Sequence, residues 1–510
     1  SAPRPARMGA DERLLHLLNR LTFGPRPGDL KRLKRLGATA FIDQQLHPET
    51  IDDSACDAAL KAYPILTKTS YQLSEEYPNP QKALKEGQED PHRPREMLEQ
   101  LSAAKLVRAT RSQRQLEEVL LDFWFNHFNV AFNKNQDKWL LASYERDVLR
   151  PRVLGKFRDL LGAVAHSPAM LVYLDNFQST VDARYASPEE QMMIQDMESR
   201  MAMREKGKGR RKLGLNENYA RELMELHTLG VDGGYTQKDV TELARILTGW
   251  SIERPNPKND LKDFQYVFRP RMHDPGDKVL LGQAFPSGGQ EEGERALDLL
   301  ARHPSTARFI ALKLCRRFVA DEPPPALVAK VAARFTASDG DIRETLKALF
   351  TSPEFYDPKH FRGKVKSPFE FVASALRASR AELRDPVRVA QALNAMGEPL
   401  YVCEPPTGYP DLAQPWINAG ALLQRMNAAL MLFGPNPNAP AHADPRAVCD
   451  EGCDGPQGKP LAVDAYVRAF LGGRIAERTR SAILERIDHP AVDQARIAAL
   501  VLGSPDFQRR

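Results

Sequence analysis

The chain has 510 residues, of which 42% are hydrophobic and 27% are charged, a composition typical of a globular protein with an ample core. Its net charge of +5 and pI near 8.8 are only mildly basic and the charge is diffuse, so we expect no nucleic-acid partner. No uninterrupted apolar run reaches the roughly 18 residues that a membrane-spanning helix needs, so we expect no membrane span.

Residues 1–70 are predicted to form N-terminal helices, followed by a main helical domain over residues 71–433. A helix predicted from about Pro94 to Ala131 ends in LEEVLLDFWFNHFNVAF, which places Trp124 and His127 on one aromatic face. A histidine on such a face is usually a hydrogen-bonded core residue, and a buried ligand or acid–base group is the alternative. His127 is therefore expected to point into the protein.

Residues 179–215 are predicted to form a lid-like insertion. Within them an amphipathic segment carries Met193, Met197 and Met201 four residues apart, followed by a basic run. Three interpretations stay open: a mobile lid over a site, a copper-binding methionine stripe, and a solvated helix packed through adaptable methionines.

The densest run of polar and ionisable residues lies between Asn216 and Trp250 and predicts a helical hairpin. The first helix extends from about Asn218 to Leu229, with Asn216 or Asn218 as its N-cap, and the second begins at a capping box of Thr236 and Asp239. Glycines at 230, 233 and 234 let the chain turn sharply between the two helices.

One stripe of the first helix is predicted to hold Asn218, Glu222 and Glu225, with Arg221 one turn from Glu225. His227 would lie about 140° around the helix from Glu222, so the two cannot bind one metal from the same helical turn. A shared centre needs a bend after Glu225 or ligands from other helices. The simpler interpretation is an Arg221–Glu225 surface pair and a packed His227.

A β-hairpin is predicted over residues 264–285, with His273 and Asp274 at its turn. This pair has two interpretations, a metal-binding or base-orienting site and ordinary turn chemistry. A linker over 434–462 and a C-terminal helical cap over 463–510 follow. The expected fold class is mainly α, a large multi-helix body with one or two short β-hairpins.

Five cysteines are too few for a disulfide scaffold. In an oxidising compartment Cys449 would pair with Cys453, or one of them with Cys403, whereas Cys315 would stay buried. The signatures of serine hydrolases, zincins, P-loop enzymes, dinucleotide enzymes and c-type cytochromes are absent from the sequence.

Several ordered segments resemble the DUF1800 family, large bacterial proteins of unknown function. The strongest is NENYARELMELHTLGVDGGYT with DVTELARILTGW. The others are FGPRPGDL, FWFNHFNV, FRDLLGAVAHSPAMLVYLDN, HDPGDKVLLG, ARFIALKLCRRFVADEPP and KVKSPFEFVASALRA. The resemblance implies extracytoplasmic work, in the periplasm or as a secreted protein, with the signal peptide outside this chain and a second exported protein encoded nearby as a partner.

These observations lead to a hypothesis of an exported enzyme with a metal ion or a non-covalent haem, with oxidoreductase chemistry favoured. In it His127, His227 and Glu222 are ligands or acid–base groups, and Arg221 orients substrate. Asn216, Asn218 and Trp124 contact substrate, and His273 and Asp274 are further metal candidates. The alternatives are a non-catalytic exported scaffold and a metal-dependent hydrolase of an extracellular polymer.

Overall fold

The computed structural model describes residues 7–79, 93–182, 188, 191–192, 195–196, 199, 214–256, 258–448, 459–487 and 494–510. The expected mainly α fold is confirmed, since the described residues hold many helices and three two-stranded antiparallel sheets. No described helix is both long and apolar enough to cross a bilayer. The predicted methionine stripe at Met193, Met197 and Met201 lies outside the described residues, as do Cys449 and Cys453.

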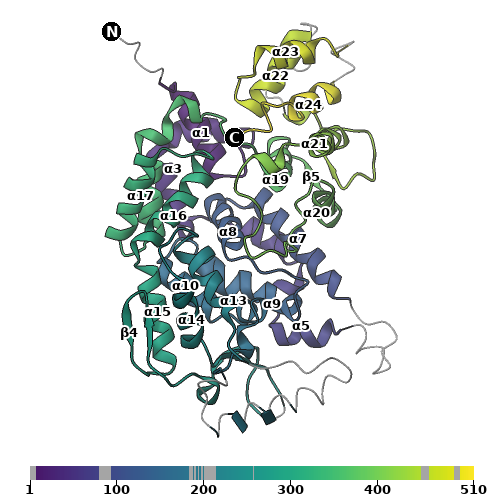
Figure 1. Cartoon of the computed structure of the whole chain (residues 1–510). Coiled ribbons are helices and arrows are strands. Elements are labelled where there is room, and N and C mark those ends of the chain that lie inside the picture. Colours follow the sequence, from purple (N-terminus) through teal and green to yellow (C-terminus); the bar gives the residue numbers. More distant parts are fainter. Residues whose placement is uncertain are drawn as a thin grey trace, which may run out of the picture.

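The helices of the first half surround α8 and form the centre of the molecule (Figure 1). They are α1 (Ala10–Leu21), α2 (Asp29–Leu36), α3 (Ala38–Leu46), α4 (Ser54–Leu60), α5 (Ser70–Glu76), α7 (Pro94–Arg111), α8 (Gln115–His127), α9 (Asp137–Ser143), α10 (Phe157–Ala165), α11 (Pro168–Tyr173), α13 (Glu217–Glu222) and α14 (Gln237–Ile246). Two segments, Tyr144–Leu149 and Leu223–Thr228, are π-helical.

The long helix expected over 94–131 is divided into α7 and α8 at residues 112–114. A buried carboxylate, Asp53, accepts hydrogen bonds from the hydroxyl of Ser112 and the backbone N–H of Gln113. The Ser112 hydroxyl in turn accepts the N–H of Arg114. These side-chain bonds replace the helical backbone ladder, so the chain changes direction between the two helices.

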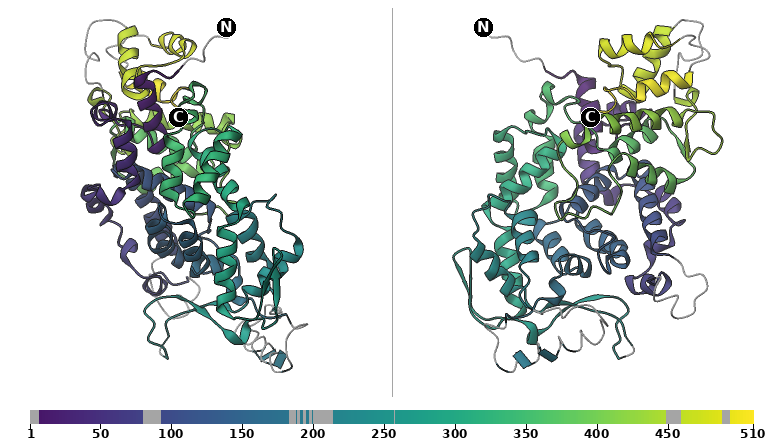
Figure 2. Two further views of the ribbon diagram at one scale, coloured as in Figure 1. Left: turned by 90° about the vertical axis from the view of Figure 1, so that its left-hand side faces the viewer. Right: turned by 45° about the vertical axis from the view of Figure 1, so that its right-hand side comes forward.

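The second half adds the helices that cover α8 and reach the C-terminal end. They are α15 (Gln290–Ala301), α16 (Pro304–Phe318), α17 (Pro325–Ala337), α18 (Ile342–Phe350), α19 (Pro368–Ala378), α20 (Pro386–Ala395), α21 (Ala419–Leu432), α22 (Lys459–Leu471), α23 (Glu477–Leu484) and α24 (Gln494–Leu502). Figures 1 and 2 show α22, α23 and α24 together at one end of the molecule, next to α21. Buried apolar residues from Leu17 to Phe507 form one continuous cluster.

The strands pair differently from the expected hairpin over 264–285. Strand β2 (Gln265–Phe268) pairs with β1 (Trp250–Glu253), and β3 (Lys278–Leu280) pairs with β4 (Gln283–Phe285). The β3–β4 turn has positive φ at both central residues, Leu281 and Gly282, which suits the twist of a two-residue hairpin. A third pair joins β5 (Glu382–Leu383) to β6 (Ala441–His442). Only β6 lies inside the linker predicted over 434–462.

Candidate functional site

The two histidines singled out from the sequence meet in the interior. His127 is the last residue of α8, and His227 lies in the π-helical turn Leu223–Thr228 that continues α13. Their rings lie 6.3 Å apart between centroids, and His127 Nε2 donates to the carbonyl oxygen of His227 at 3.1 Å. Both side chains are buried, at 2% and 1% exposure. The structure thus brings these two predicted site residues together.

A π-helical turn extends the helix of His227 toward its end. Two hydrogen bonds satisfy carbonyl groups of this turn. The N–H of Leu229 donates to the carbonyl of Met224 at 2.7 Å, and the Thr228 hydroxyl donates to the carbonyl of Leu223 at 2.6 Å. A π-helical turn holds an extra residue and changes the directions of the side chains around it, and such turns occur often at functional sites. The regular helix expected up to Leu229 therefore does not describe where His227 points.

Burial sets the protonation of this histidine pair. Burial and the positive charge of Lys313 lower the pKa of His227 to about 3, and the same two causes hold the pKa of His127 well below its ordinary value. Both rings are therefore neutral at neutral pH, and the Nδ1 atom of each is buried without a hydrogen-bond partner. In the described part of the chain, no three or more His, Cys, Asp or Glu side chains converge as metal ligands. A bound metal or haem stays a prediction.

The other residues predicted on the first helix lie at its outer side. Arg221 donates to the Gln237 side chain at 2.7 Å and lies 3.7 Å from Glu217, so its ion pair is with Glu217 and not with Glu225. Burial and the charge of Glu225 raise the pKa of the half-buried Glu222. These four charged side chains form a partly exposed cluster along α13 and the π-helical turn that follows it.

Two further candidates hold the structure around them. Asn216 caps α13 by accepting the N–H of Asn218 at 2.9 Å, and it donates to the carbonyl of Leu174. The fully buried Trp124 donates from its indole N–H to the carbonyl of Val153. Asn218 contributes its backbone N–H to the cap, and its side chain is exposed.

His273 and Asp274 lie in a buried network between β2 and β3. His273 contacts the carbonyl of Thr248 at 2.9 Å and the carboxylate of Glu292 at 3.2 Å, and Asp274 pairs with Arg245 at 2.8 Å. These contacts tie the turn to α14 and α15. They match the turn-chemistry interpretation more closely than a metal site.

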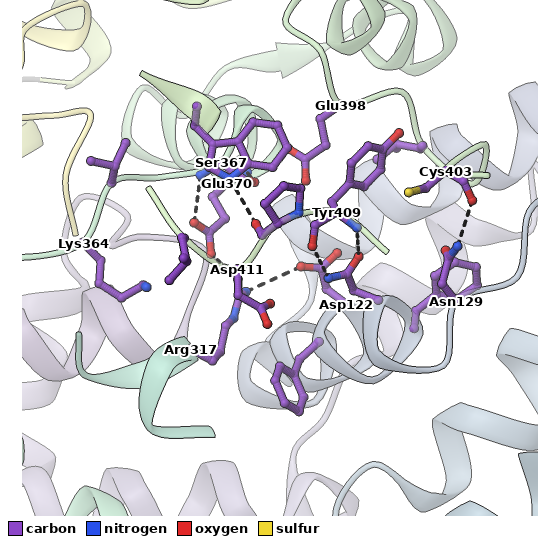
Figure 3. Close-up of a pocket in the computed structure, with 18 of the residues that line it drawn as sticks. Asp122, Asn129, Arg317, Lys364, Ser367, Glu370, Glu398, Cys403, Tyr409 and Asp411 are labelled. Atoms are coloured by element: carbon purple, nitrogen blue, oxygen red, sulfur yellow. Dashed lines mark hydrogen bonds and ion pairs between the residues drawn. The ribbon is translucent and has the colours of Figure 1, made fainter. Parts of the chain in front are cut away.

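A cavity of about 80 Å³ lies on the other side of α8, among α7, α8, α16, α19 and the segment 398–416 (Figure 3). Its lining is rich in charged side chains: Lys105, Asp122, Arg317, Lys364, Glu370, Glu398, Asp411 and Arg510. A space of this size holds a few water molecules or one small polar group of a larger ligand.

Glu398 is the carboxyl group of the cavity whose pKa is raised. It follows α20, and its Oε2 accepts the backbone N–H of Phe369 at 2.7 Å. Burial and the negative charge of Asp122 raise the pKa of Glu398 to about 7. Near neutral pH this side chain is therefore present both as an acid and as a carboxylate.

Helix α8 separates the cavity from the histidine pair. Asp122 faces the cavity and contacts Lys105 at 2.7 Å, whereas His127 faces the opposite side. Phe123 forms the wall between them, since it lines the cavity and stacks on His127. Lys313, whose charge acts on both histidines, pairs with Asp411 of the cavity at 3.3 Å. The two polar sites are neighbours that share one helix.

Comparison with known proteins gives a family and no activity. A family model described as "Protein of unknown function (DUF1800)" matches residues 16–509. The chain belongs to the DUF1800 family. No curated protein and no solved structure matches it.

Three of the segments that carry the DUF1800 resemblance supply much of the cavity lining. FWFNHFNV provides Phe123, ARFIALKLCRRFVADEPP provides Arg317, and KVKSPFEFVASALRA provides Lys364 and Glu370. Nearly 250 residues separate the first of these DUF1800 segments from the last, so the sequence does not show that they meet. The charged residues of the second and third segments were the available signal. Glu398 and Arg510 lie outside these segments and had no such signal.

Proposed function

We propose that this DUF1800 protein is an exported enzyme that uses Glu398 as a general acid–base in the cavity beside α8. The observation that supports this most is the pKa of about 7 for Glu398, inside a cavity that also holds Asp122. A catalytic acid or base works best when its pKa is close to the working pH, and most structural carboxylates are fully ionised there.

The reaction class that suits this arrangement is hydrolysis. Glu398 Oε2 accepts the N–H of Phe369, and the Ser367 side chain also hydrogen-bonds this carboxyl group, which holds one proton in its acid form. In its acid form Glu398 donates that proton to a leaving oxygen of the substrate, and in its ionised form it accepts a proton from attacking water. Asp122 contacts Lys105 at 2.7 Å and lies 3.6 Å from Arg317, which positions both cations at the cavity wall.

A second candidate function is the metal- or haem-dependent oxidoreductase. One observation favours it, the buried and unpartnered Nδ1 atoms of His127 and His227. Imidazole nitrogens are common ligands of zinc, copper and iron. Elemental analysis and an absorption spectrum of the protein purified from its native exported fraction test this candidate. Stoichiometric iron or copper, lost in His127→Ala, supports it, and a metal-free colourless protein rejects it.

The hydrolase proposal is tested by the titration of Glu398 itself. Infrared difference spectra of wild type and Glu398→Gln, recorded between pH 5 and 9, should contain a carboxyl band that titrates near pH 7 and is absent from the variant. The matched control is Glu382→Gln, which changes an exposed carboxylate paired with Arg384. Titration of Glu398 at the ordinary pKa of a glutamate would remove the basis of the proposal.

Activity is then measured on a panel of extracellular polysaccharides and esters. On any substrate that the wild type cleaves, we expect Glu398→Gln to lower kcat by about 100-fold or more, with little effect of Glu382→Gln. Fractionation of cells that carry the complete gene tests export, which rests on the family resemblance. An exclusively cytoplasmic protein would contradict that part of the proposal.

A further inference from the structure

Buried cationic side chains gather behind the cavity in unusual number. In the described part of the chain, six such side chains lie around residues 508–510 and the start of α19. They are Arg20, Arg317, Lys364, Lys366, Arg425 and Arg510. All are at least largely buried, and Arg20 and Arg425 are fully so. Their charges act on one another, since Arg510 and Arg317 both disfavour the charged form of Arg20.

Side-chain carboxylates compensate only part of this positive charge. Glu370 accepts hydrogen bonds from Arg317 and lies 2.8 Å from Arg510, and Asp321 pairs with Lys364. The charges of Arg317 and Arg510 outweigh burial and hold the pKa of Glu370 at about 2, so it stays ionised. Three carboxylates, Glu370, Asp321 and Asp122, which lies 3.6 Å from Arg317, therefore face six basic side chains.

The remaining cations have only neutral partners. Arg20 donates to the carbonyl of His360, Lys366 donates to the Ser374 hydroxyl, and Arg425 lies 3.4 Å from the side-chain oxygen of Gln508. An uncompensated buried charge costs several kcal/mol, which raises the affinity of the cluster for an added negative charge. Burial and the charge of Arg510 accordingly lower the pKa of Lys364 to about 8.

Three of these basic residues line the cavity, and two of them hold N–H groups without hydrogen-bond partners. The three are Arg317, Lys364 and Arg510. The Nε of Arg510, a residue with 4% exposure, and the Nε and Nη2 of Arg317 are buried without hydrogen-bond partners. Figure 3 shows Lys364, Arg317 and Glu370 grouped at one side of the cavity, with Glu398 at another. Guanidinium groups bind the oxygens of carboxylate, phosphate and sulfate through such donors.

Three carboxylates of the lining already have cationic partners. Asp122 is paired with Lys105 and lies 3.6 Å from Arg317, Asp411 is paired with Lys313, and Glu370 is shared by Arg317 and Arg510. Apart from Glu398, the unused hydrogen-bonding capacity of the lining is thus made of donors next to an excess of positive charge.

We propose that Arg317, Lys364 and Arg510 bind an oxyanion group of the substrate, which makes the enzyme specific for molecules that carry a carboxylate, phosphate or sulfate. This inference rests on the proposed function, since it assigns the substrate class of the same cavity. Arg20 lies behind the three and strengthens the positive field. The anionic group would be held at one side of the cavity while Glu398 exchanges its proton at the other.

Binding of simple anions tests the proposal without a known substrate. Inorganic phosphate, sulfate and acetate are added to the full-length protein at tens of millimolar, against sodium chloride of equal ionic strength, and the melting temperature and binding heat are measured. We expect at least one oxyanion to raise the melting temperature saturably above the chloride control. The absence of any oxyanion-specific stabilisation of the wild type would overturn the proposal.

Two lysines of one segment provide the matched variants. Lys364→Met removes a cation that lines the cavity, and Lys366→Met removes an equally buried cation that contacts Ser374 instead. We expect Lys364→Met to weaken oxyanion binding about tenfold or more, and Lys366→Met to leave it within a few-fold of wild type. Equal losses in both variants would mean a diffuse electrostatic effect and no site.

Glu398→Gln separates this inference from the proposed function. It removes the acid–base group and leaves the three cations, so oxyanion binding should persist in it. Binding without any hydrolytic activity would retain the anion site and reject the enzyme. Activity on neutral substrates without oxyanion binding would retain the enzyme and reject the anion site.

Discussion

Asp137, the first residue of α9, is a fully buried carboxyl group, and neither of its oxygens has a hydrogen-bond partner. Burial and the negative charge of Asp175 raise its pKa well above the ordinary value. A raised carboxyl pKa means that stability is complete at acidic pH and falls as the pH rises above the unfolded value of about 4. Asp137 is therefore a site where the ionised form is costly.

We predict that Asp137→Asn raises the melting temperature by a few degrees at pH 7 and has little effect near pH 4. The amide keeps the size of the side chain and cannot ionise. Thermal unfolding at both pH values measures the difference, with the exposed Asp232→Asn as the control. A lower melting temperature at pH 7 would mean that the ionised carboxylate has a stabilising partner.

Individual residues were predictable from the sequence where local chemistry sets their role. Asn216 was expected to cap a helix and does so, and His127 was expected to point into the protein and is buried. The contact of His127 with the carbonyl of His227 was not predictable in its geometry, because it depends on a π-helical turn that periodicity does not reveal. Glu398 was missed because its raised pKa comes from neighbours distant in sequence.

Between elements, α15 and β1 approach so closely that only glycine fits. A Cβ atom at Gly293 of α15 would lie 2.1 Å from the Trp250 ring of β1. Trp250 is fully buried and stacks on His166, so it has no room to move. The residue just before this strand, Gly249, has a φ of +78°, which also excludes most side chains.

Gly293→Ala is therefore expected to destabilise the protein by about 1–3 kcal/mol or more through overpacking. Gly288→Ala is the matched control, since its added Cβ would meet only ordinary contacts at 3.6 Å. Melting temperatures and the fluorescence of Trp250 report the effect. Equal stability of the two variants would show that α15 can shift away from β1 at little cost.

Elements that depend on their own residues were predicted well, and pairings between distant elements were not. Thr236 and Asp239 form the reciprocal cap that was expected at the start of α14. The strands expected within 264–285 exist, but β2 pairs with β1, which the sequence did not identify as a strand. Alternation of side chains indicates a strand and leaves its partner open.

For the whole molecule, a net charge of +5 gave no indication that buried cations gather at one place. Arg20, Arg317 and Arg510 come from nearly the full length of the chain, and only the fold brings them together. The helical patterns along the chain correctly indicated a mainly α fold, because each depends on residues close together in the sequence. The candidate site depends on which buried charged side chains lack an oppositely charged partner, and only the three-dimensional packing decides this.

The buried histidines make global stability sensitive to acid. Burial lowers the pKa of His227 from 6.5 to about 3 and holds the pKa of His127 well below 6.5. Between these values the unfolded chain binds protons that the folded protein does not, so stability rises with pH across this window and is complete above 6.5. Each such histidine contributes a slope of about 1.4 kcal/mol per pH unit at most.

We predict that the melting temperature of the wild type falls steadily from pH 7 to pH 5 and that His227→Gln falls less steeply over the same range. The slope is compared and not the melting temperature itself, because the substitution also removes packing against Phe128. His47→Gln, which changes a half-buried histidine bonded to the carbonyl of Asp43, is the control and should keep the wild-type slope. Parallel curves for all three proteins would mean that His227 is protonated, or bound to another group, in the folded state. The comparison of slopes isolates His227 because Glu398 and Asp137, whose raised pKa values give the opposite dependence on pH, are the same in all three proteins.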